Sequence, residues 1–244
     1  MVITSLENDK VKELVKLQKK KYRDLTGTFL VEGEHLVEEV FKADLVINII
    51  CLEDYNCSYD VPVMYVSYDV MKKISSLDTP PTIMALCRKK EDSIIGERVL
   101  LLDNIQDPGN LGTIIRSSVS FNVDTIVLSP NSVDLYNPKV LRSTQGMFCH
   151  VNIVYADIVE TINMLHEKDF IVYGTNVING VDVRSVSLPK YWALVMGNEG
   201  SGVSKEILDL CDSNLYIKMN SKVESLNVSI ACSILLYELG RLDG

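Results

Sequence analysis

The chain has 244 residues, of which 47% are hydrophobic and 23% charged, as is typical of a globular protein with one large and one small domain. Its net charge of −9 excludes a protein that coats nucleic acid with a uniformly basic surface, because lysine and arginine supply the affinity for phosphate. No apolar run reaches the roughly 18 residues of a membrane-spanning helix, and residues 1–4 do not open a secretory signal. We therefore expect a cytoplasmic protein with no membrane partner.

The six cysteines are spread along the chain without a Cys-x-x-Cys pair, and Cys87, Cys149 and Cys232 lie within apolar segments. This distribution is typical of reduced thiols that are buried as small hydrophobic side chains. It favours neither a disulfide framework nor a zinc site. We therefore expect a protein that binds no metal.

Positive charge is concentrated in one segment near the amino terminus. Residues 10–23 hold seven basic side chains against the single acid Glu13, whereas the rest of the chain is strongly acidic. This asymmetry is compatible with a local RNA-binding surface, although a charge run taken alone more often marks a solvated helix face. The basic residues are Lys10, Lys12, Lys16, Lys19, Lys20, Lys21 and Arg23.

The first 90 residues alternate between helical and strand-like patterns. Residues 23–27 are expected to end the first helix, and Pro62 favours either an edge position or the start of the third strand. The elements predict a small α/β domain over residues 1–90, followed by a polar linker at 91–97. Apolar periodicity places helices at 8–22, 36–41 and 70–74, and strands at 28–31, 45–52, 61–66 and 82–87.

Residues 98–244 alternate strands and helices more regularly, which predicts a mostly parallel sheet with helices on both faces. The last helix is apolar on nearly all sides, so it must be buried in its own core or against a second subunit, and the pattern does not distinguish these. The strands are predicted at 99–102, 125–128, 149–154, 170–173 and 192–196, and the helices at 111–121, 138–145, 157–167, 203–210 and 226–239.

The first strand of this part leads into a turn and a helix. Residues 107–110, Asp-Pro-Gly-Asn, combine turn and capping chemistry, and an apolar helical stripe begins at Leu111. Arg116 lies about 120° from the centre of that stripe. A cation beside a turn at the carboxyl end of a strand is typical of ligand sites in open α/β sheets. An ordinary connection with a solvated arginine fits this stretch equally well.

Three segments, in order, resemble the signature motifs of the SpoU/TrmH-like RNA 2′-O-ribose methyltransferases of the SPOUT superfamily. The first is Asp-Pro-Gly-Asn-Leu-Gly-Thr-Ile-Ile-Arg at 107–116, and the second is Val-Met-Gly-Asn-Glu-Gly-Ser-Gly-Val at 195–203. The third combines Ile-Lys-Met at 217–219 with Val-Glu-Ser-Leu-Asn-Val-Ser at 223–229. Residues 29–34, Phe-Leu-Val-Glu-Gly-Glu, are also similar to the opening of the small substrate-binding domain that many family members carry. Three ordered motifs are a far more specific signal than one.

The resemblance implies a C-terminal SPOUT α/β domain with a trefoil knot, a smaller N-terminal RNA-binding α/β domain, and S-adenosyl-L-methionine (AdoMet) as cofactor. It also implies a homodimer whose active site lies at the subunit interface. The knot does not follow from periodicity. The implied cofactor-binding residues are Gly197, Ile217, Leu226, Thr175, Asn198, Gly200, Met219 and Asn227, and the implied catalytic residues are Arg116, Asn110, Glu199, Ser225 and Asn227.

The reaction implied by the family is methyl transfer from the sulfonium of AdoMet to a ribose 2′-OH of RNA. The two-domain layout is similar to that of members acting on large-subunit (23S) rRNA, with tRNA as the alternative substrate. Arg116 would contact the 2′-OH or the adjacent phosphate, and Asn110 would orient it. A guanidinium, with a pKa above about 12, is a poor base, so electrostatic stabilisation is the expected role. Lys139 and Arg142 lie in another family-like segment and are candidates for contacts with phosphate.

Two other classes of function are compatible with parts of the sequence. One is a catalytically silent relative that uses the same fold for RNA binding or assembly, and the intact motif residues disfavour it. The other is an α/β protein acting on small metabolites, which the basic segment disfavours. Cofactor binding and salt-sensitive RNA binding would separate these possibilities.

Overall fold

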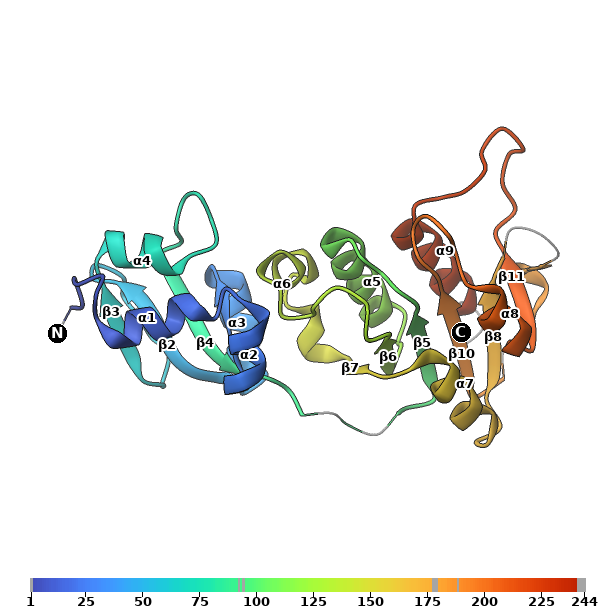
Figure 1. Cartoon of the computed structure of the whole chain (residues 1–244), viewed down its shortest axis with the longest axis horizontal. Helices are drawn as coiled ribbons and strands as arrows, with labels where there is room; N and C mark the ends of the chain where they lie inside the picture. Colours follow the sequence, from blue (N-terminus) through green and yellow to red (C-terminus); the bar gives the residue numbers. More distant parts are fainter. Residues whose placement is uncertain (1, 92, 94, 177–179, 188, 241–244) are drawn as a thin grey trace. The chain divides into compact units, whose positions relative to one another are not determined.

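The structure, a computed structural model, describes residues 2–91, 93, 95–176, 180–187 and 189–240. Positions 92 and 94 of the expected linker, and 241–244 of the expected second domain, lie outside the described residues. The chain forms two compact units, each with its own sheet (Figure 1). The N-terminal unit comprises Met1–Glu91 and Asp134–Cys149, and the C-terminal unit comprises Asp92–Val133 and His150–Gly244.

The N-terminal unit is built on a four-stranded sheet with the strand order β1-β4-β2-β3. β4 pairs antiparallel with β1 and with β2, whereas β2 and β3 are parallel. β3 therefore lies at the edge and starts directly after Pro62, which agrees with both positions that this proline favours. The elements are α1 (Asp9–Lys16), α2 (Lys20–Thr26), β1 (Thr28–Glu32), α3 (Glu34–Lys42), β2 (Val46–Leu52), β3 (Val63–Val66), α4 (Tyr68–Ile74) and β4 (Ile83–Arg88).

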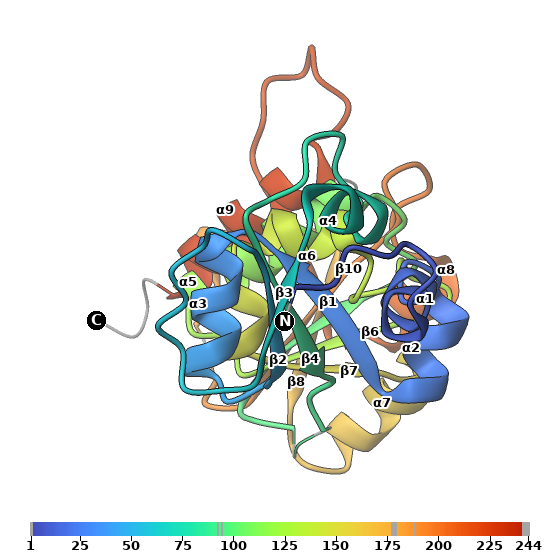
Figure 2. The same cartoon turned by 90° about the vertical axis from the view of Figure 1, so that its left-hand side faces the viewer.

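Helices cover both faces of this sheet (Figure 2). On one face, Val11 and Leu14 of α1 pack with Met71 of α4 and with Leu30 and Met84 of the strands. On the other face, α3 contacts β1 and β4 through its buried apolar stripe. The apolar periodicity of these segments therefore specifies which side of each element faces the core.

The prediction of one continuous helix over residues 8–22 is wrong. Asn8 caps α1, which ends at Lys16, and a second helix, α2, starts after Lys19, whose backbone is extended. α2 then runs through the break expected at 23–27 and ends at Gly27, where φ is 64°. The helix is interrupted because Leu17 packs into the core together with Val11 and Leu14 of α1, whereas residues 18–21, which include three lysines, are exposed to solvent.

Arg23 of α2 is buried, although it belongs to the basic segment of the sequence. Its side chain is 4% exposed, and its guanidinium donates to the Leu17 carbonyl at 2.7 Å and forms an ion pair with Asp134. A buried charge is tolerated only with partners of this kind. Arg23 was predicted to contact RNA, and the structure corrects this: the residue belongs to the core of the N-terminal unit.

The segment Asp134–Cys149 completes the N-terminal unit, although it lies between two strands of the C-terminal sheet in the sequence. It holds α6 (Pro138–Thr144), which contacts β1, and a 3-10 turn follows at Met147–His150. The Phe29 ring packs against Tyr136 and Phe148, with ring centroids 4.6 and 5.9 Å apart. The division into 1–90, 91–97 and 98–244 stays a prediction, but packing adds this segment to the N-terminal unit.

The C-terminal unit is a seven-stranded parallel sheet with the order β7-β6-β5-β10-β8-β11-β9. The prediction of a mostly parallel sheet is confirmed. The elements are β5 (Arg98–Leu102), α5 (Pro108–Ser120), β6 (Thr125–Leu128), β7 (Asn152–Tyr155), α7 (Ile158–His166), β8 (Ile171–Thr175), β9 (Val181–Asp182), β10 (Trp192–Met196), α8 (Lys205–Leu210), β11 (Ser213–Tyr216) and α9 (Val228–Gly240).

Helices also cover both faces of this sheet. α7 and α8 pack on the face that carries Val99, Leu101 and Val195, and α5 packs against α9. The strand expected at 149–154 begins three residues late, because Cys149 belongs to the 3-10 turn. β9 and β11 were not predicted, since neither shows an apolar run. Within the described ranges, no helix is long and apolar enough to cross a membrane.

All six cysteines are free thiols, as their spacing predicts. Burial raises the pKa of Cys149 and of Cys211 to about 12 and also raises the pKa of the Cys232 thiol. A protonated, buried thiol is a poor nucleophile and a poor metal ligand. These cysteines therefore act as small hydrophobic side chains.

Candidate active site

Three loops meet at the edge of the C-terminal sheet where its parallel strands end. The first follows β5 and leads into α5, the second follows β10, and the third connects β11 to α9. Because the strands are parallel, their carboxyl ends lie at the same edge, which is where open α/β sheets bind ligands. The second and third motifs lie mainly in their loops, whereas the first begins at the end of its loop and continues into α5.

The loop after β10 is a tight turn closed by its own backbone. The backbone N–H of Asn198 donates to the Gly202 carbonyl at 3.1 Å, and the N–H of Gly202 donates back at 2.9 Å. A Cβ on Gly197 would lie 2.1 Å from the Gly202 carbonyl carbon, and Gly202 itself has a φ of 68°. These two positions therefore require glycine.

The Asn198 side chain holds this turn in shape. Its Oδ1 accepts hydrogen bonds from the backbone N–H groups of Gly200 and Ser201, at 2.8 and 3.3 Å. Its Nδ2 donates to the carbonyl of Asn104, at the end of β5, at 2.9 Å. One carboxamide thus connects the second loop with the first.

A line of polar side chains connects all three loops. Asn227 donates through Nδ2 to Asn110 Oδ1 at 3.0 Å, and Asn110 donates through Nδ2 to Glu199 Oε1 at 3.1 Å. The backbone N–H of Asp107 also donates to Glu199, at 3.3 Å. Asn227 Oδ1 caps α9 by accepting from the backbone N–H of Ser229 at 3.0 Å. The capping and bridging roles of Asn227 therefore coexist.

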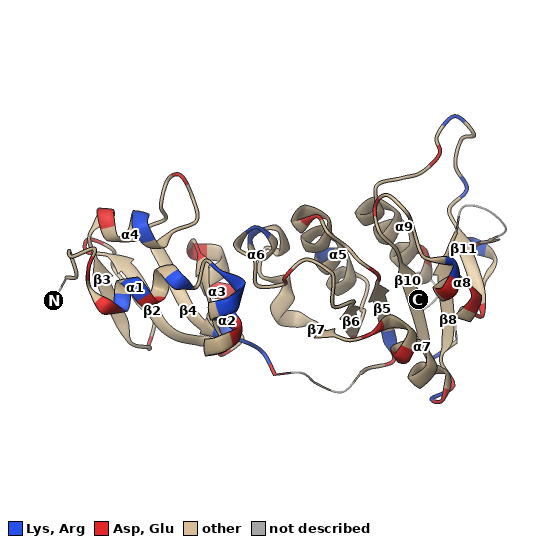
Figure 3. Cartoon of the chain, in the orientation of Figure 1, with Lys and Arg blue, Asp and Glu red and all other residues tan. Residues whose placement is uncertain are grey.

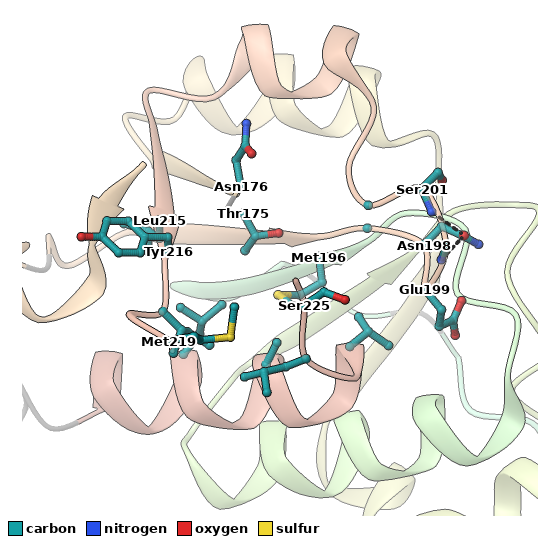
Figure 4. A pocket seen from close by; sticks show the side chains of 18 residues that line it. Thr175, Asn176, Met196, Asn198, Glu199, Ser201, Leu215, Tyr216, Met219 and Ser225 are labelled. Carbon is teal, nitrogen blue, oxygen red and sulfur yellow. Dashed lines mark hydrogen bonds between the residues drawn. The ribbon is translucent and has the colours of Figure 1, made fainter. Parts of the chain in front are cut away.

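The loops enclose a pocket of about 300 Å³ (Figure 4). Met219 and Tyr216 lie at one end of it, and Asn198 and Glu199 at the other. Its floor is apolar and includes Val228, Ala231 and Leu235 of α9. The lining residues are Thr175, Asn176, Met196, Gly197, Asn198, Glu199, Gly200, Ser201, Gly202, Leu215, Tyr216, Ile217, Met219, Ser225, Leu226, Val228, Ala231 and Leu235.

Most of the predicted site residues lie at this pocket. Of the eight residues predicted to bind the cofactor, all but Asn227 line it, and Asn227 lies in the chain between the lining residues Leu226 and Val228. Among the predicted catalytic residues, Glu199 and Ser225 line the pocket, whereas Asn110 contacts it only through Glu199.

Arg116 does not line the pocket of its own chain. It lies on α5 six residues after Asn110, so at 100° per residue its side chain is rotated by about 240° from that of Asn110. The side chain is exposed to solvent. A single chain therefore brings together Asn110, Glu199 and Asn227 but leaves the arginine on another side of the helix.

Lysine and arginine residues cluster on α1 and α2 of the N-terminal unit (Figure 3), but their side chains differ in exposure. Lys10, Lys16, Lys19, Lys20 and Lys21 are exposed on α1, α2 and the turn between them. Lys12 is exposed but forms an ion pair with Glu7 at 3.0 Å. Among the basic residues predicted to bind RNA, the exposed ones are therefore closest together at Lys19, Lys20 and Lys21, in the turn and at the start of α2.

The two candidates on α6 are also placed differently. Lys139 is exposed, whereas Arg142 donates through Nη1 to Ser76 Oγ at 2.8 Å. Ser76 in turn donates to the buried carboxylate of Glu32 at 2.6 Å. Arg142 thus has a structural partner in the N-terminal unit. Of the two α6 candidates, Lys139 is the one whose ammonium group is exposed and available to phosphate.

Comparison with known proteins finds a family model for each part of the chain. Residues 97–237 match the SpoU rRNA Methylase family, and residues 8–85 match the MRM3-like substrate binding domain. The chain belongs to the SpoU rRNA methylase family. The 23S rRNA (guanosine(2553)-2′-O)-methyltransferase RlmP of Bacillus subtilis (strain 168) is 38% identical over 243 residues, which cover 97% of this chain and 98% of the relative.

Solved structures agree with this assignment. An RNA 2′-O ribose methyltransferase is similar to this SpoU family member with a TM-score of 0.85 at 26% identity, covering 100% of this chain and 99% of that one. An AdoMet-bound rRNA methyltransferase from Sinorhizobium meliloti has a TM-score of 0.87 at 27% identity, covering 99% and 97%. The family resemblance of the three motifs is therefore confirmed.

Some pocket residues of this SpoU family member were missed from the sequence. Leu215 and Tyr216 belong to β11, which has no apolar run to mark it as a strand. Ala231 and Leu235 looked like ordinary core residues of the last helix. Met196 and Ser201 lie within the quoted second motif, so their position in the motif was the signal that could have found them.

Proposed function

We propose that this chain transfers the methyl group of AdoMet to a ribose 2′-OH of 23S rRNA in the cytoplasm. The observation that carries the proposal is the meeting of three family motifs around one pocket, joined by the Asn227–Asn110–Glu199 hydrogen bonds. The 38% identity to a 23S rRNA 2′-O-methyltransferase along nearly the full chain supports the choice of substrate.

The pocket fits AdoMet in size and in chemistry. Its volume is at the lower end of the range for small-molecule sites, about 300–1,000 Å³, and its walls combine apolar side chains with a few polar groups. Gly197, Ile217 and Leu226 would hold the adenine through their backbone groups, with Thr175 and Met219 beside them. Bound AdoMet supplies an electrophilic methyl group on its sulfonium. The glycine turn lets backbone atoms approach such a ligand closely.

Arg116 is proposed to stabilise the negative charge that develops on the ribose oxygen. A guanidinium retains its proton at neutral pH, so the proton of the 2′-OH passes to substrate phosphate or to water. Positioning of the hydroxyl in line with the methyl group supplies further rate enhancement. Glu199 and Asn110 keep the neighbouring loops in place, and no step needs a metal.

We propose that the chain forms a homodimer in which Arg116 of one subunit reaches the pocket of the other. Arg116 is exposed and lies outside the pocket of its own chain, so a complete site needs a second copy. α9 also exposes two large apolar side chains, Ile230 at 49% and Tyr237 at 51%. An apolar face beside the site is typical of a subunit interface.

Replacing Ile230 with arginine is expected to weaken the dimer, because a charge would be buried at an apolar interface. Sedimentation equilibrium should show dimeric wild type and a shift of the variant toward monomer. Leu25→Arg is the matched control, since Leu25 is an exposed leucine of the N-terminal unit. A monomeric wild type, or an Ile230→Arg variant as dimeric as the control, would contradict the proposed dimer.

The turn between α1 and α2 is proposed to bind RNA phosphate. Replacing Lys19, Lys20 and Lys21 together with alanine should weaken RNA binding and reduce the slope of log affinity against log salt by about 2–3, since each lost phosphate contact removes roughly 0.7–0.9. Filter binding at several salt concentrations measures both. Lys42→Ala is the control, because Lys42 already pairs with Glu38 and Glu39. Equal slopes for wild type and the triple variant would place the RNA elsewhere.

The function itself is tested by methyl transfer from labelled AdoMet to 23S rRNA and to tRNA. Mapping of the labelled nucleotide then allows a test of a 23S fragment with a 2′-deoxyribose at that position. The proposal expects labelling of 23S rRNA that the 2′-deoxy substitution abolishes. Labelling of tRNA alone would overturn the choice of substrate. RNA binding without cofactor binding or methyl transfer would identify a catalytically silent relative.

A further inference from the structure

Asn104 lies directly behind the site without lining the pocket, and it has an unusual backbone conformation. It follows β5 with a φ of 60°, in the left-handed region that residues with a Cβ rarely adopt. Asparagine tolerates this region better than most residues, but it still costs free energy relative to ordinary conformations. Such a conformation persists only when surrounding contacts hold it.

Three hydrogen bonds hold Asn104 in place. Its backbone N–H donates to Ser129 Oγ at 2.7 Å, and its Oδ1 accepts from Gln106 Nε2 at 2.7 Å. Its carbonyl accepts from Asn198 Nδ2 at 2.9 Å. The residue therefore connects the ends of β5, β6 and β10.

The bond between the Asn104 carbonyl and Asn198 orients the carboxamide that shapes the glycine turn. With Nδ2 held by Asn104, Asn198 Oδ1 is directed at the backbone N–H groups of Gly200 and Ser201. If Asn104 left the left-handed region, its carbonyl would turn away and Asn198 could rotate. Gly200 and Ser201 line the pocket, so the loss of their hydrogen bonds to Asn198 would alter the pocket wall.

We propose that Asn104 is a positioning residue for the cofactor pocket, acting through its left-handed backbone and its carbonyl on Asn198. This role rests on the proposed function, because it assumes that AdoMet binds there. The Asn104 side chain bonds Gln106, which also donates to the Asn131 carbonyl at 2.6 Å, so φ rather than the side chain sets the direction of the Asn104 carbonyl. Glycine, which adopts positive φ freely, should therefore replace it, whereas alanine should not.

The test measures binding of S-adenosylhomocysteine by isothermal titration calorimetry to wild type, Asn104→Ala and Asn104→Gly. Asn104→Ala should weaken binding by about threefold to tenfold, the worth of one net hydrogen bond, and Asn104→Gly should bind like wild type. In the ligand-free protein, hydrogen exchange at Gly200 and Ser201 should be faster in Asn104→Ala only. The Michaelis constant for RNA should be unchanged in all three proteins.

Asn122 offers a matched control. It has a φ of 58° in the same unit, follows α5, and precedes β6 at the opposite edge of the sheet from the pocket. Asn122→Ala carries the same backbone strain, so it should lower stability without changing binding. The positioning role alone would be overturned by either of two results. One is equal affinity of wild type and Asn104→Ala for S-adenosylhomocysteine, and the other is a loss of affinity in Asn104→Gly as large as in Asn104→Ala. A wild type that does not bind S-adenosylhomocysteine would instead overturn the proposed function.

Discussion

Replacing Arg116 with alanine is expected to lower the rate of methyl transfer by about 10²- to 10³-fold, the loss typical of one charge-stabilising donor in an active site. The affinity for S-adenosylhomocysteine should stay nearly unchanged, because Arg116 does not line the pocket of its own chain. Single-turnover kinetics and calorimetry measure the two quantities separately. Arg184→Ala is the control, since Arg184 is exposed and bound to Asp182.

Mixing two inactive variants tests whether Arg116 acts across the proposed dimer. Gly197→Val should destroy the pocket, because even a Cβ there would overlap the Gly202 backbone. A heterodimer of Arg116→Ala and Gly197→Val would contain one intact pocket facing one intact arginine, so activity should return on mixing. No recovery would contradict action in trans, and equal loss of rate and of cofactor affinity in Arg116→Ala would contradict its catalytic role.

Replacing Asp134 with alanine is expected to destabilise the N-terminal unit by about 3–5 kcal/mol, because the charge of Arg23 would remain buried without its partner. Hydrogen exchange of the β1 amides, followed by mass spectrometry over a urea series, measures the free energy of opening in that unit. Trp192, the single tryptophan of the chain, lies in β10 and reports on the C-terminal unit separately.

The double variant Arg23→Met/Asp134→Leu separates a lost ion pair from lost packing. Replacing both partners with apolar residues removes the unpaired charge and should recover most of the stability. Glu7→Ala breaks the exposed pair with Lys12 and should leave opening of β1 unchanged. If Asp134→Ala behaves like Glu7→Ala, the segment Asp134–Cys149 contributes little to the N-terminal unit.

Much of the C-terminal unit could be predicted from local pattern. The strands at 99–102, 125–128 and 192–196 are buried apolar runs, and such runs alternating with amphipathic helices leave few arrangements other than a parallel sheet. The three motifs also marked most of the pocket, because turn glycines and capping asparagines carry their backbone requirements in their residue types. Leu215 and Tyr216 escaped notice because β11 is only partly buried, with Leu215 as its one buried residue, so the strand carries no apolar run.

By itself the sequence determined most of the order of the elements, the family and the loops that form the site, since periodicity, turn chemistry and capping act over a few neighbouring residues. Tertiary structure alone decided three further points: that Arg23 is buried against Asp134, that Asp134–Cys149 packs on β1, and that Arg116 lies outside its own pocket. The physical reason is that each depends on which distant residue supplies the partner. The sequence does not show whether the charge of an arginine is solvated by water, paired with an aspartate 111 residues away or paired with a substrate.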